Sequence, residues 1–386
     1  MPRFFALQRT TAALCVVLLT SACGGGSDIA PNVVVEITAP SGDSPVFELQ
    51  TPLSVEATVA VNTLTAPDDT PVHFSSSAGL FAPATASTRN GQAHSALWGT
   101  VPGPHTLRAE AEVAGVRTGN TKSFYLRHTP APLEVLVPAY FYPSTGSGWT
   151  LLASSVAAHP GLKVTAILNP NNGIFSTADR RYVEAAGNFV HAGGQLLGYV
   201  HTSYGTGVRS LSDVQTNIDR YLELYGRDLI SGIFLDEMSG QSSTLDFYRQ
   251  VYHYIKAKDP SLRVVGNPGT IPATDMAGVS DALITFEGTA ADFAHYDPRK
   301  KGGWLYTLSN NRQGTLLHSA SSCTAMQTAL RTAASTQTNS GLVYVTHRPY
   351  DYATNTGNPW ASLPSYWTEL LDSVQALNQG QPLPSC

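Results

Sequence analysis

The chain has 386 residues, of which 42% are hydrophobic and only 13% are charged, and its formal net charge is −5. This length predicts two or three domains, and the charged fraction, about half of the usual ~25%, excludes a disordered chain. No run rich in Lys or Arg is present to follow a phosphate backbone, so we expect no nucleic-acid partner.

Residues 1–22 have the pattern of an export signal, because a basic start precedes the run TAALCVVLL, which is too short to span a membrane. The segment LTSACGGGS resembles the signal of bacterial lipoproteins, although Thr20 stands where that family usually has Leu. The resemblance implies lipidation at Cys23, a flexible tether over 23–30, and a position at the outer membrane or cell surface. The alternative is an ordinary signal peptide with an incidental Cys.

Residues 31–128 have the pattern of a β-sandwich. Short alternating segments such as VVVEITAP, PLSVEATVAV and AHSALWGTV are separated by turn residues such as SGD, APDD and RNG. The stretch from TPVHFSSSAGLF to PGPHTLRAEAEV resembles the immunoglobulin-like repeats of invasin-type bacterial surface proteins. That resemblance implies a spacer module, which TPAP, residues 129–132, links to the rest of the chain.

Over residues 133–386 apolar strands alternate with amphipathic helices. The strands are near-continuous apolar runs, as in a parallel sheet that is covered on both faces. We expect eight of them, over 133–143, 162–170, 195–205, 232–238, 263–270, 282–289, 302–310 and 341–351. Eight strands with crossovers in about 250 residues predict an α/β TIM barrel, with a doubly wound open sheet as the alternative.

Helices are expected in most of the intervals between these strands. Ser210 is placed to cap the start of one of them, and Gly226 is placed to end it. The expected helices cover 148–158, 178–193, 211–225, 245–255, 320–336 and 364–378. The connections after the fifth and sixth strands are short and only weakly helical.

Polar and aromatic side chains gather at the carboxyl ends of the expected strands, where TIM barrels place their sites. In chain order they are Tyr140, Asn169, His201, Tyr204, Asp236, Glu237, Asn267, Glu287, Tyr306 and His347. We expect all but the three acids to bind substrate, because Tyr, Asn and His suit the faces and hydroxyls of sugars. The simpler interpretation is that the histidines pack or form hydrogen bonds and that Tyr140 and Tyr306 belong to the core.

The three acids Asp236, Glu237 and Glu287 are the candidate catalytic residues. Glycoside hydrolysis needs one carboxylate to attack the sugar or activate water, and one carboxylic acid to protonate the leaving oxygen. Repulsion between the acids and the apolar residues beneath them would raise the pKa of one acid and leave the other ionised. Two alternatives are a helix-capping Asp and a Ca²⁺ or Mg²⁺ site. Because further acids and Cys/His metal spacings are missing, we expect no metal and no other cofactor.

Several segments carry a resemblance to the spherulin-4-like family, in order over about residues 134–375. They are LVPAYFYPSTGSGWTLLA, VTAILNPNNG, GQLLGYVHTSYGTG, GIFLDEM, VVGNPGT and ITFEGT. The resemblance implies a TIM-barrel glycoside hydrolase similar to endo-α-1,4-galactosaminidases that act on galactosamine-containing exopolysaccharide. The family's acidic motif falls on Asp236 and Glu237, and its later catalytic Glu falls on Glu287. By analogy with retaining barrel enzymes, Asp236 is the nucleophile and Glu287 the acid/base, while Glu237 orients one of them or binds a substrate amine.

The predicted function is therefore an exported, endo-acting hydrolase of an α-1,4-linked galactosamine or N-acetylgalactosamine polymer of the kind found in biofilms. The alternative is a non-catalytic polysaccharide-binding or adhesin-like surface protein, which the sandwich favours and the three acids oppose. The acetylation of the substrate, the stereochemistry and the oligomeric state stay open at this level.

Two cysteines remain once Cys15 leaves with the signal and Cys23 is lipidated. An even pair in an exported chain predicts a disulfide between Cys323 and Cys386. In a TIM barrel the last helix packs beside the helix after the seventh strand. The tail that ends in Cys386 can therefore reach back to Cys323 at the start of that helix. The alternatives are two free thiols or a terminal Cys that is disordered.

Overall fold

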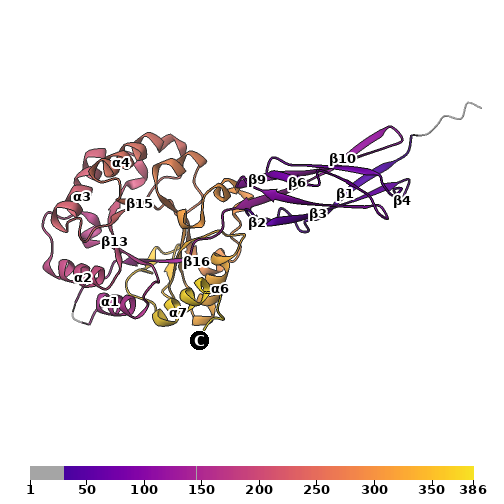
Figure 1. Ribbon diagram of the computed structural model, residues 1–386. Helices are drawn as coiled ribbons and strands as arrows, with labels where there is room; N and C mark the ends of the chain where they lie inside the picture. The colour runs from indigo at the N-terminus through magenta and orange to yellow at the C-terminus, as the bar shows by residue number, and fades with distance from the viewer. Residues whose placement is uncertain (1–29, 145) are drawn as a thin grey trace, which may run out of the picture.

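The computed structural model describes residues 30–144 and 146–386 and consists of an elongated β-body attached to a rounded α/β body (Figure 1). The predicted signal peptide and Cys23 lie outside the described residues. Within the described ranges, no helix has both the length and the apolar character that a membrane crossing requires.

The N-terminal body is built from two five-stranded sheets, which run in the orders β1-β3-β8-β6, with β4 beside β3, and β2-β10-β9-β5-β7. Its strands are β1 (Val33–Ala39), β2 (Val46–Glu48), β3 (Pro52–Val61), β4 (Leu64–Thr65), β5 (Pro71–Ser75), β6 (Gly79–Ala82), β7 (Thr85–Ser87), β8 (Gln92–Gly99), β9 (Gly103–Val113) and β10 (Val116–Arg127). Alternate residues of both sheets, such as Val55 and Leu107, share one apolar core. This is a sandwich arrangement, while the immunoglobulin-like relationship remains a prediction.

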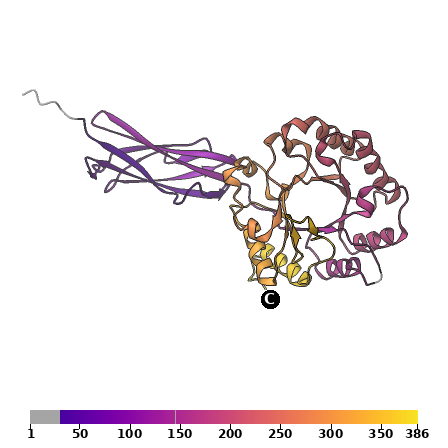
Figure 2. The same cartoon turned by 180° about the vertical axis from the view of Figure 1, so that it is seen from behind.

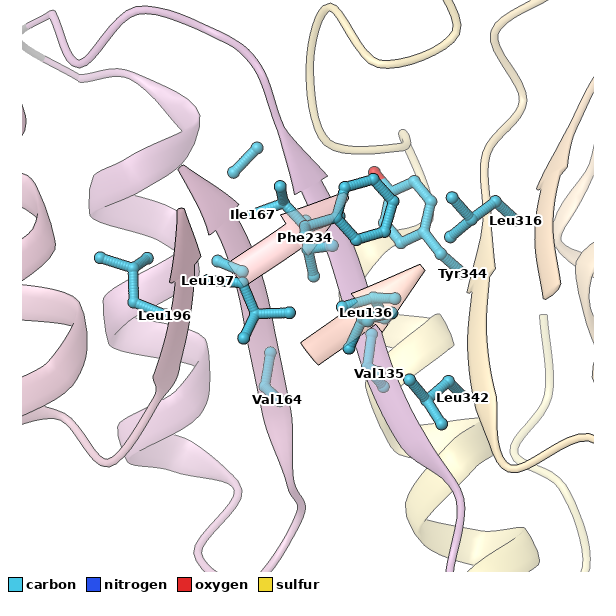
Figure 3. Close-up of a cluster of buried hydrophobic side chains, with 14 of the residues drawn as sticks. Val135, Leu136, Val164, Ile167, Leu196, Leu197, Phe234, Leu316, Leu342 and Tyr344 are labelled. Atoms are coloured by element: carbon cyan, nitrogen blue, oxygen red, sulfur yellow. The ribbon is translucent and has the colours of Figure 1, made fainter. Parts of the chain in front are cut away.

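The C-terminal body is a closed barrel of eight parallel strands that pair in chain order. They are β11 (Glu134–Ala139), β12 (Val164–Leu168), β13 (Gln195–His201), β14 (Gly232–Asp236), β15 (Arg263–Gly266), β16 (Ala282–Thr289), β17 (Gln313–His318) and β18 (Leu342–Val345). Closure confirms the TIM-barrel prediction and excludes the open sheet. Figure 3 shows apolar side chains of several strands, from Val135 to Tyr344, gathered in the core.

Helices surround the barrel on its outer side (Figures 1 and 2). The longer ones are α1 (Gly148–Ala158), α2 (Arg180–His191), α3 (Leu211–Leu224), α4 (Leu245–Lys258), α6 (Cys323–Ala334) and α7 (Trp367–Asn378), whereas α5 (Ala290–Phe293) is a single turn. The predicted caps of α3 are present: Ser210 and Asp213 form a capping box, and Gly226 follows the helix with a φ of 80°.

The seventh strand is not where the sequence pattern predicts it. Residues 302–310 contain the 3₁₀ turn η6 (Gly303–Thr307) and the start of η7 (Asn310–Arg312), and β17 begins only at Gln313. The run GGWLYTLSN is apolar because it is buried under the N-terminal body, where the rings of Tyr306 and Tyr125 lie 4.9 Å apart. The predicted strand over 302–310 is therefore wrong. The eighth strand is also shorter than predicted, and Tyr350–Asp351 belongs to a separate hairpin with Thr356–Gly357.

The two bodies are also joined by hydrogen bonds at the amino-terminal end of the barrel. Asn310, the first residue of the turn η7 before β17, donates from Nδ2 to the carbonyl of Ala131 and accepts from its N–H, both at 2.8 Å. The guanidinium of Arg127 reaches from β10 to the carbonyl of Ser335 at 3.3 Å. The linker 129–132 is therefore held against the barrel.

A disulfide joins Cys323, the first residue of α6, to Cys386, with 5.6 Å between the two Cα atoms. The returning tail is also held by the amide of Gln327, which donates to the carbonyl of Pro384 at 2.8 Å. The predicted bridge is confirmed. It fixes the carboxyl terminus against the helix that follows the seventh strand.

Candidate active site

Asp236 is the last residue of β14, and the four residues before it are fully buried in the barrel wall. Two neutral donors hold its carboxylate: the hydroxyl of Tyr199 donates to Oδ2 at 2.7 Å, and Nδ2 of Asn267 donates to Oδ1 at 2.8 Å. Tyr199 comes from β13 and Asn267 follows β15, so the strands on either side of β14 position this acid.

Glu287 reaches the same amide from β16. Nδ2 of Asn267 donates to its Oε2 at 2.6 Å as well as to Asp236 at 2.8 Å, so those two carboxyl oxygens are separated by no more than the sum of the two distances, 5.4 Å. The amide is fixed in turn, because its Oδ1 accepts from the N–H of Gly269 at 3.0 Å and its side chain is buried. One side chain thus sets the spacing of the two acids.

The pKa of Glu287 is raised to about 7, mainly by burial and secondly by the negative charge of Asp236, while the hydrogen bond from Asn267 opposes the rise. At mildly acidic pH this carboxyl therefore holds its proton. A protonated carboxyl next to a carboxylate is the arrangement that general acid catalysis requires.

Glu237 is held in a strained backbone conformation beside this pair. Its φ of 49° is unusual for a residue with a side chain. Its carbonyl accepts from the N–H of Tyr204 at 2.7 Å and from Oγ1 of the fully buried Thr202 at 2.8 Å. Its carboxylate has no hydrogen-bond partner among the residues that the structure describes. A carboxylate without such a partner is available to a ligand.

Positive φ angles recur at the neighbouring strand ends. Asn171 and Asn172 after β12, and Ser203 and Tyr204 after β13, all have φ between 47° and 58°. Strained backbone conformations of this kind cluster at functional sites, where the surrounding structure supports them. The backbone at the carboxyl ends of β12, β13 and β14 therefore has the strained conformations that are typical of functional sites.

Two of the predicted tyrosines form walls around the acids. The ring of Tyr140 meets that of Tyr199 edge-on at 5.3 Å, and burial and the charge of Asp236 raise the pKa of Tyr140 well above its usual value. Tyr204 is 55% exposed, and burial together with the charges of all three acids raises its pKa. The structure thus brings Tyr140, Tyr204 and Asn267 together with the acids.

Three other predicted residues lie at strand ends, and none of them has a hydrogen bond to the three acids among the described residues. Asn169 is buried after β12, and its Oδ1 has no partner in the described part of the chain. His201 lies against the guanidinium of Arg209, whose Nη1 is 3.1 Å from Nδ1 of the ring. His347 accepts from the N–H of Ser365 at 3.2 Å. Both histidines thus make the packing and hydrogen-bonding contacts of the simpler interpretation.

Tyr306 is not part of the site. It lies in η6, before β17 instead of after it, and hence at the amino-terminal end of the barrel. Its side chain is fully buried, and its hydroxyl donates to the carbonyl of Gln337. The error in the seventh strand placed this residue at the wrong end, and it serves the contact between the two bodies.

The true end of the seventh strand provides residues that the sequence analysis missed. His318 ends β17, and its Nε2 lies 3.0 Å from the hydroxyl of Tyr352 in the hairpin after β18. Tyr199 was also missed, although it precedes His201 by two residues and so shares its face of the strand. The signal for Tyr199 was present in the sequence, whereas His318 required the correct seventh strand.

A cleft of about 700 Å³ opens beside Glu287. Phe286 and Tyr296 form part of its apolar lining, and Tyr352, Lys300 and Lys301 line it as well. No group of three or more His, Cys, Asp or Glu side chains in residues 30–144 and 146–386 is arranged to hold a metal ion. The site therefore combines a carboxyl pair with an adjoining cleft large enough for sugar units.

Comparison with known proteins agrees with this geometry. The model of the Spherulin4 family, described as spherulation-specific family 4, matches residues 134–374. Spherulin-4 of Physarum polycephalum is 34% identical over 257 residues, which cover 64% of this chain and 71% of Spherulin-4. The crystal structure of Aspergillus clavatus Sph3 in complex with GalNAc matches with a TM-score of 0.53 and 25% identity, over 63% of this chain and 98% of Sph3. The chain belongs to spherulation-specific family 4.

Proposed function

We propose that this protein is a glycoside hydrolase that cleaves an α-1,4-linked galactosamine or N-acetylgalactosamine polymer at internal bonds. The observation that carries the proposal is the single amide nitrogen of Asn267, which bridges Asp236 and Glu287 and keeps their oxygens within 5.4 Å, the sum of 2.8 and 2.6 Å. The complex of the related Sph3 with GalNAc supports an amino sugar as the unit that is bound.

The two acids take different roles because their surroundings differ. Asp236, held by Tyr199 and Asn267, attacks the anomeric carbon, while Glu287 donates its proton to the leaving oxygen. In the second step Glu287 removes a proton from water, which displaces the sugar from Asp236. Retaining glycosidases hold their two carboxyl groups about 5–5.5 Å apart and inverting ones roughly 6.5–9.5 Å apart. One oxygen of each acid, Oδ1 of Asp236 and Oε2 of Glu287, lies within 5.4 Å (2.8 plus 2.6 Å) of the other. We assign the retaining mechanism because it needs closely spaced carboxyl groups.

Glu237 is assigned to the substrate. Its carboxylate lacks a partner in the described part of the chain, and its backbone is fixed by Thr202 and Tyr204. A carboxylate in this position accepts a hydrogen bond from the nitrogen substituent of an amino sugar. It would therefore orient the sugar unit next to Asp236.

We also propose that the protein is exported and anchored by lipid at Cys23, with the sandwich as a spacer. The support is the signal-like sequence before Cys23. The elongated shape of the N-terminal body also fits a spacer (Figure 1).

The direct test measures release of reducing ends from partially deacetylated α-1,4-galactosamine polymer by the mature chain. We expect cleavage that falls at least ~1000-fold in Asp236→Asn, because the isosteric amide cannot attack. Asp246→Asn on the surface of α4, where the side chain is 85% exposed, is the matched control and should stay within about twofold. Binding without cleavage between pH 4 and 8 would instead identify a non-catalytic polysaccharide-binding protein.

A further inference from the structure

We propose that the cleft beside Glu287 ends in a subsite for a carboxylate-bearing sugar unit, a uronic acid, formed by Lys300 and Lys301. The inference rests on the proposed function, because it adds an acidic unit to the amino-sugar polymer that the same site would cleave. The subsite would give the enzyme a preference for an acidic sugar unit, which the three acids of the site do not explain.

The position of the two lysines is the first observation. The cleft of about 700 Å³ is lined by Glu287 at the end of β16 and by Lys300 and Lys301 beyond α5, and no residue of β12, β13 or β14 lines it. The cleft therefore leads away from the nucleophile Asp236. Because Glu287 gives its proton to the leaving oxygen, the sugar units in this cleft lie on the leaving-group side of the bond.

The charge balance of this outer part is the second observation. Asp297 is already paired: Nε and Nη2 of Arg299 donate to its two carboxylate oxygens at 2.9 and 2.8 Å. Lys300 and Lys301 are exposed, and neither side chain has an ion-pair or hydrogen-bond partner among the described residues. Apart from Glu287, the remaining acid of the lining is Asp292, whose Oδ2 accepts from the hydroxyl of Thr289 at 2.7 Å. Beside Glu287, the lining thus has two lysines without an ion pair and one such carboxylate, although the whole chain has a net charge of −5.

The N-terminal body holds this segment in place. Lys300 ends the 3₁₀ turn η5 (Pro298–Lys300). Arg299 in the same turn donates from Nη1 to the carbonyls of Asp43 and Ser44 at 2.9 and 3.1 Å, and its own carbonyl accepts from the hydroxyl of Tyr125 at 3.3 Å. Figure 2 shows the sandwich meeting the barrel at this side. A backbone fixed in this way lowers the ordering cost that binding would otherwise carry.

The expected preference follows from the charge. A protonated galactosamine unit is repelled by the two lysines, an N-acetylated unit is neutral to them, and a uronic acid unit is attracted. Exposed ion pairs are each worth little, so two of them should favour the acidic unit roughly two- to thirtyfold at low salt. Salt should remove the effect, because both ammonium groups are open to solvent.

The test compares two synthetic α-1,4-linked pentasaccharides of equal length. One contains only N-acetylgalactosamine, and in the other galacturonic acid replaces the unit at the reducing end. We expect the native mature chain to cleave the acidic one with kcat/KM roughly two- to thirtyfold higher, and this ratio should fall to about one in 0.5 M NaCl. The double variant Lys300→Ala/Lys301→Ala should have a ratio of about one at low salt. Arg180→Ala/Arg331→Ala, which removes two exposed charges on α2 and α6, should keep the native ratio.

A ratio near one in the native chain, or a ratio that survives in the lysine variant, would overturn the subsite. Calorimetric binding of the same two pentasaccharides to Glu287→Gln separates this outcome from failure of the proposed function. If neither sugar is cleaved but the acidic one binds more tightly through the lysines, the subsite stands and the hydrolase does not. If both are cleaved at equal rates and bind equally, the hydrolase stands and the subsite does not.

Discussion

Asn267 determines much of the chemistry at the scale of single residues. Its amide nitrogen contacts both acids, and its amide oxygen is fixed by the backbone of Gly269. Burial and the charge of Asp236 raise the pKa of Glu287, while the bond from Asn267 restrains the rise to about 7. The residue therefore both spaces the pair and tunes the acid.

The raised pKa of Glu287 predicts how activity depends on pH. The acid must be protonated for the first step, so kcat/KM should fall as the pH rises through about 7. Asn267→Ala removes the hydrogen bond that lowers this pKa, so the alkaline limb should move upward by about one pH unit while kcat falls roughly tenfold or more.

A pH profile of kcat/KM for both proteins tests this expectation. Asn188→Ala on α2, which lines a pocket that contains none of the three acids, serves as the control and should leave the limb in place. An alkaline limb that does not move in Asn267→Ala, or that moves downward, would show that Glu287 is not the titrating acid.

At the scale of elements, the ends of β13 and β14 work as one unit. Oγ1 of Thr202 donates to the carbonyls of Asp236 and Glu237 at 3.0 and 2.8 Å and lies 2.9 Å from the hydroxyl of Tyr248. Tyr248 also accepts from the N–H of Ser239 at 2.9 Å. This buried network supports the strained conformation of Glu237, which no sheet hydrogen bond holds.

Thr202→Val should disturb this unit without changing its volume. The loss of the hydroxyl leaves the carbonyls of Asp236 and Glu237 with only their backbone N–H donors and removes a partner of the buried Tyr248 hydroxyl. We expect this to cost about 1–3 kcal/mol of unfolding free energy and to lower kcat roughly tenfold. Thr202→Ser keeps the hydroxyl and should recover most of kcat. Denaturant unfolding and steady-state kinetics of both variants measure the effect, and a Val variant as active as the native chain would refute the role of the network.

The barrel strands show why part of the fold was predictable from sequence. Runs such as GIFLDEM combine a buried apolar stretch with acids at its carboxyl end, and so mark both the strand and the site. The run GGWLYTLSN carries the same apolar signal for another reason, since Leu305 and Tyr306 are buried between the two bodies. Local pattern does not distinguish burial in a sheet from burial at a domain contact.

The site shows the same limit. Asp236, Glu287 and Asn267 were predictable because each stands at the end of a clearly marked strand. Lys300 and Lys301 lie in a connection without strand or helix periodicity, and only the folded chain places them in the cleft with Glu287. In the described residues their side chains have no ion-pair partner, because the neighbouring Asp297 is already paired with Arg299.

At the scale of the whole molecule, the sandwich and the barrel form an elongated particle in which β1 and β4 reach far from the barrel (Figure 1). The contacts through Tyr125, Asn310 and Arg299 give the sandwich a structural role in addition to that of a spacer. They hold the segment that precedes β17 and the outer part of the cleft.

The disulfide stabilises the barrel as a whole. It closes a sequence separation of 63 residues, which should be worth about 4 kcal/mol in the chain-entropy model. Cys323→Ser/Cys386→Ser should therefore unfold at a clearly lower denaturant concentration, as followed by Trp fluorescence, and reductant should lower the native midpoint to match. Two titratable thiols in the unreduced, denatured protein, once Cys23 is removed, would contradict the bridge.

The central claim is that Asp236 and Glu287 act as nucleophile and acid/base, and the anomeric form of the first product tests it most directly. Proton NMR spectra recorded in the first minutes after the mature chain is added to an α-1,4-linked N-acetylgalactosamine pentasaccharide show which anomer is released before mutarotation. We expect the α-anomer, because attack by Asp236 and then by water inverts the anomeric centre twice. Initial release of the β-anomer would mean that water attacks directly and that Asp236 is not the nucleophile, and release of no product would contradict the hydrolase itself.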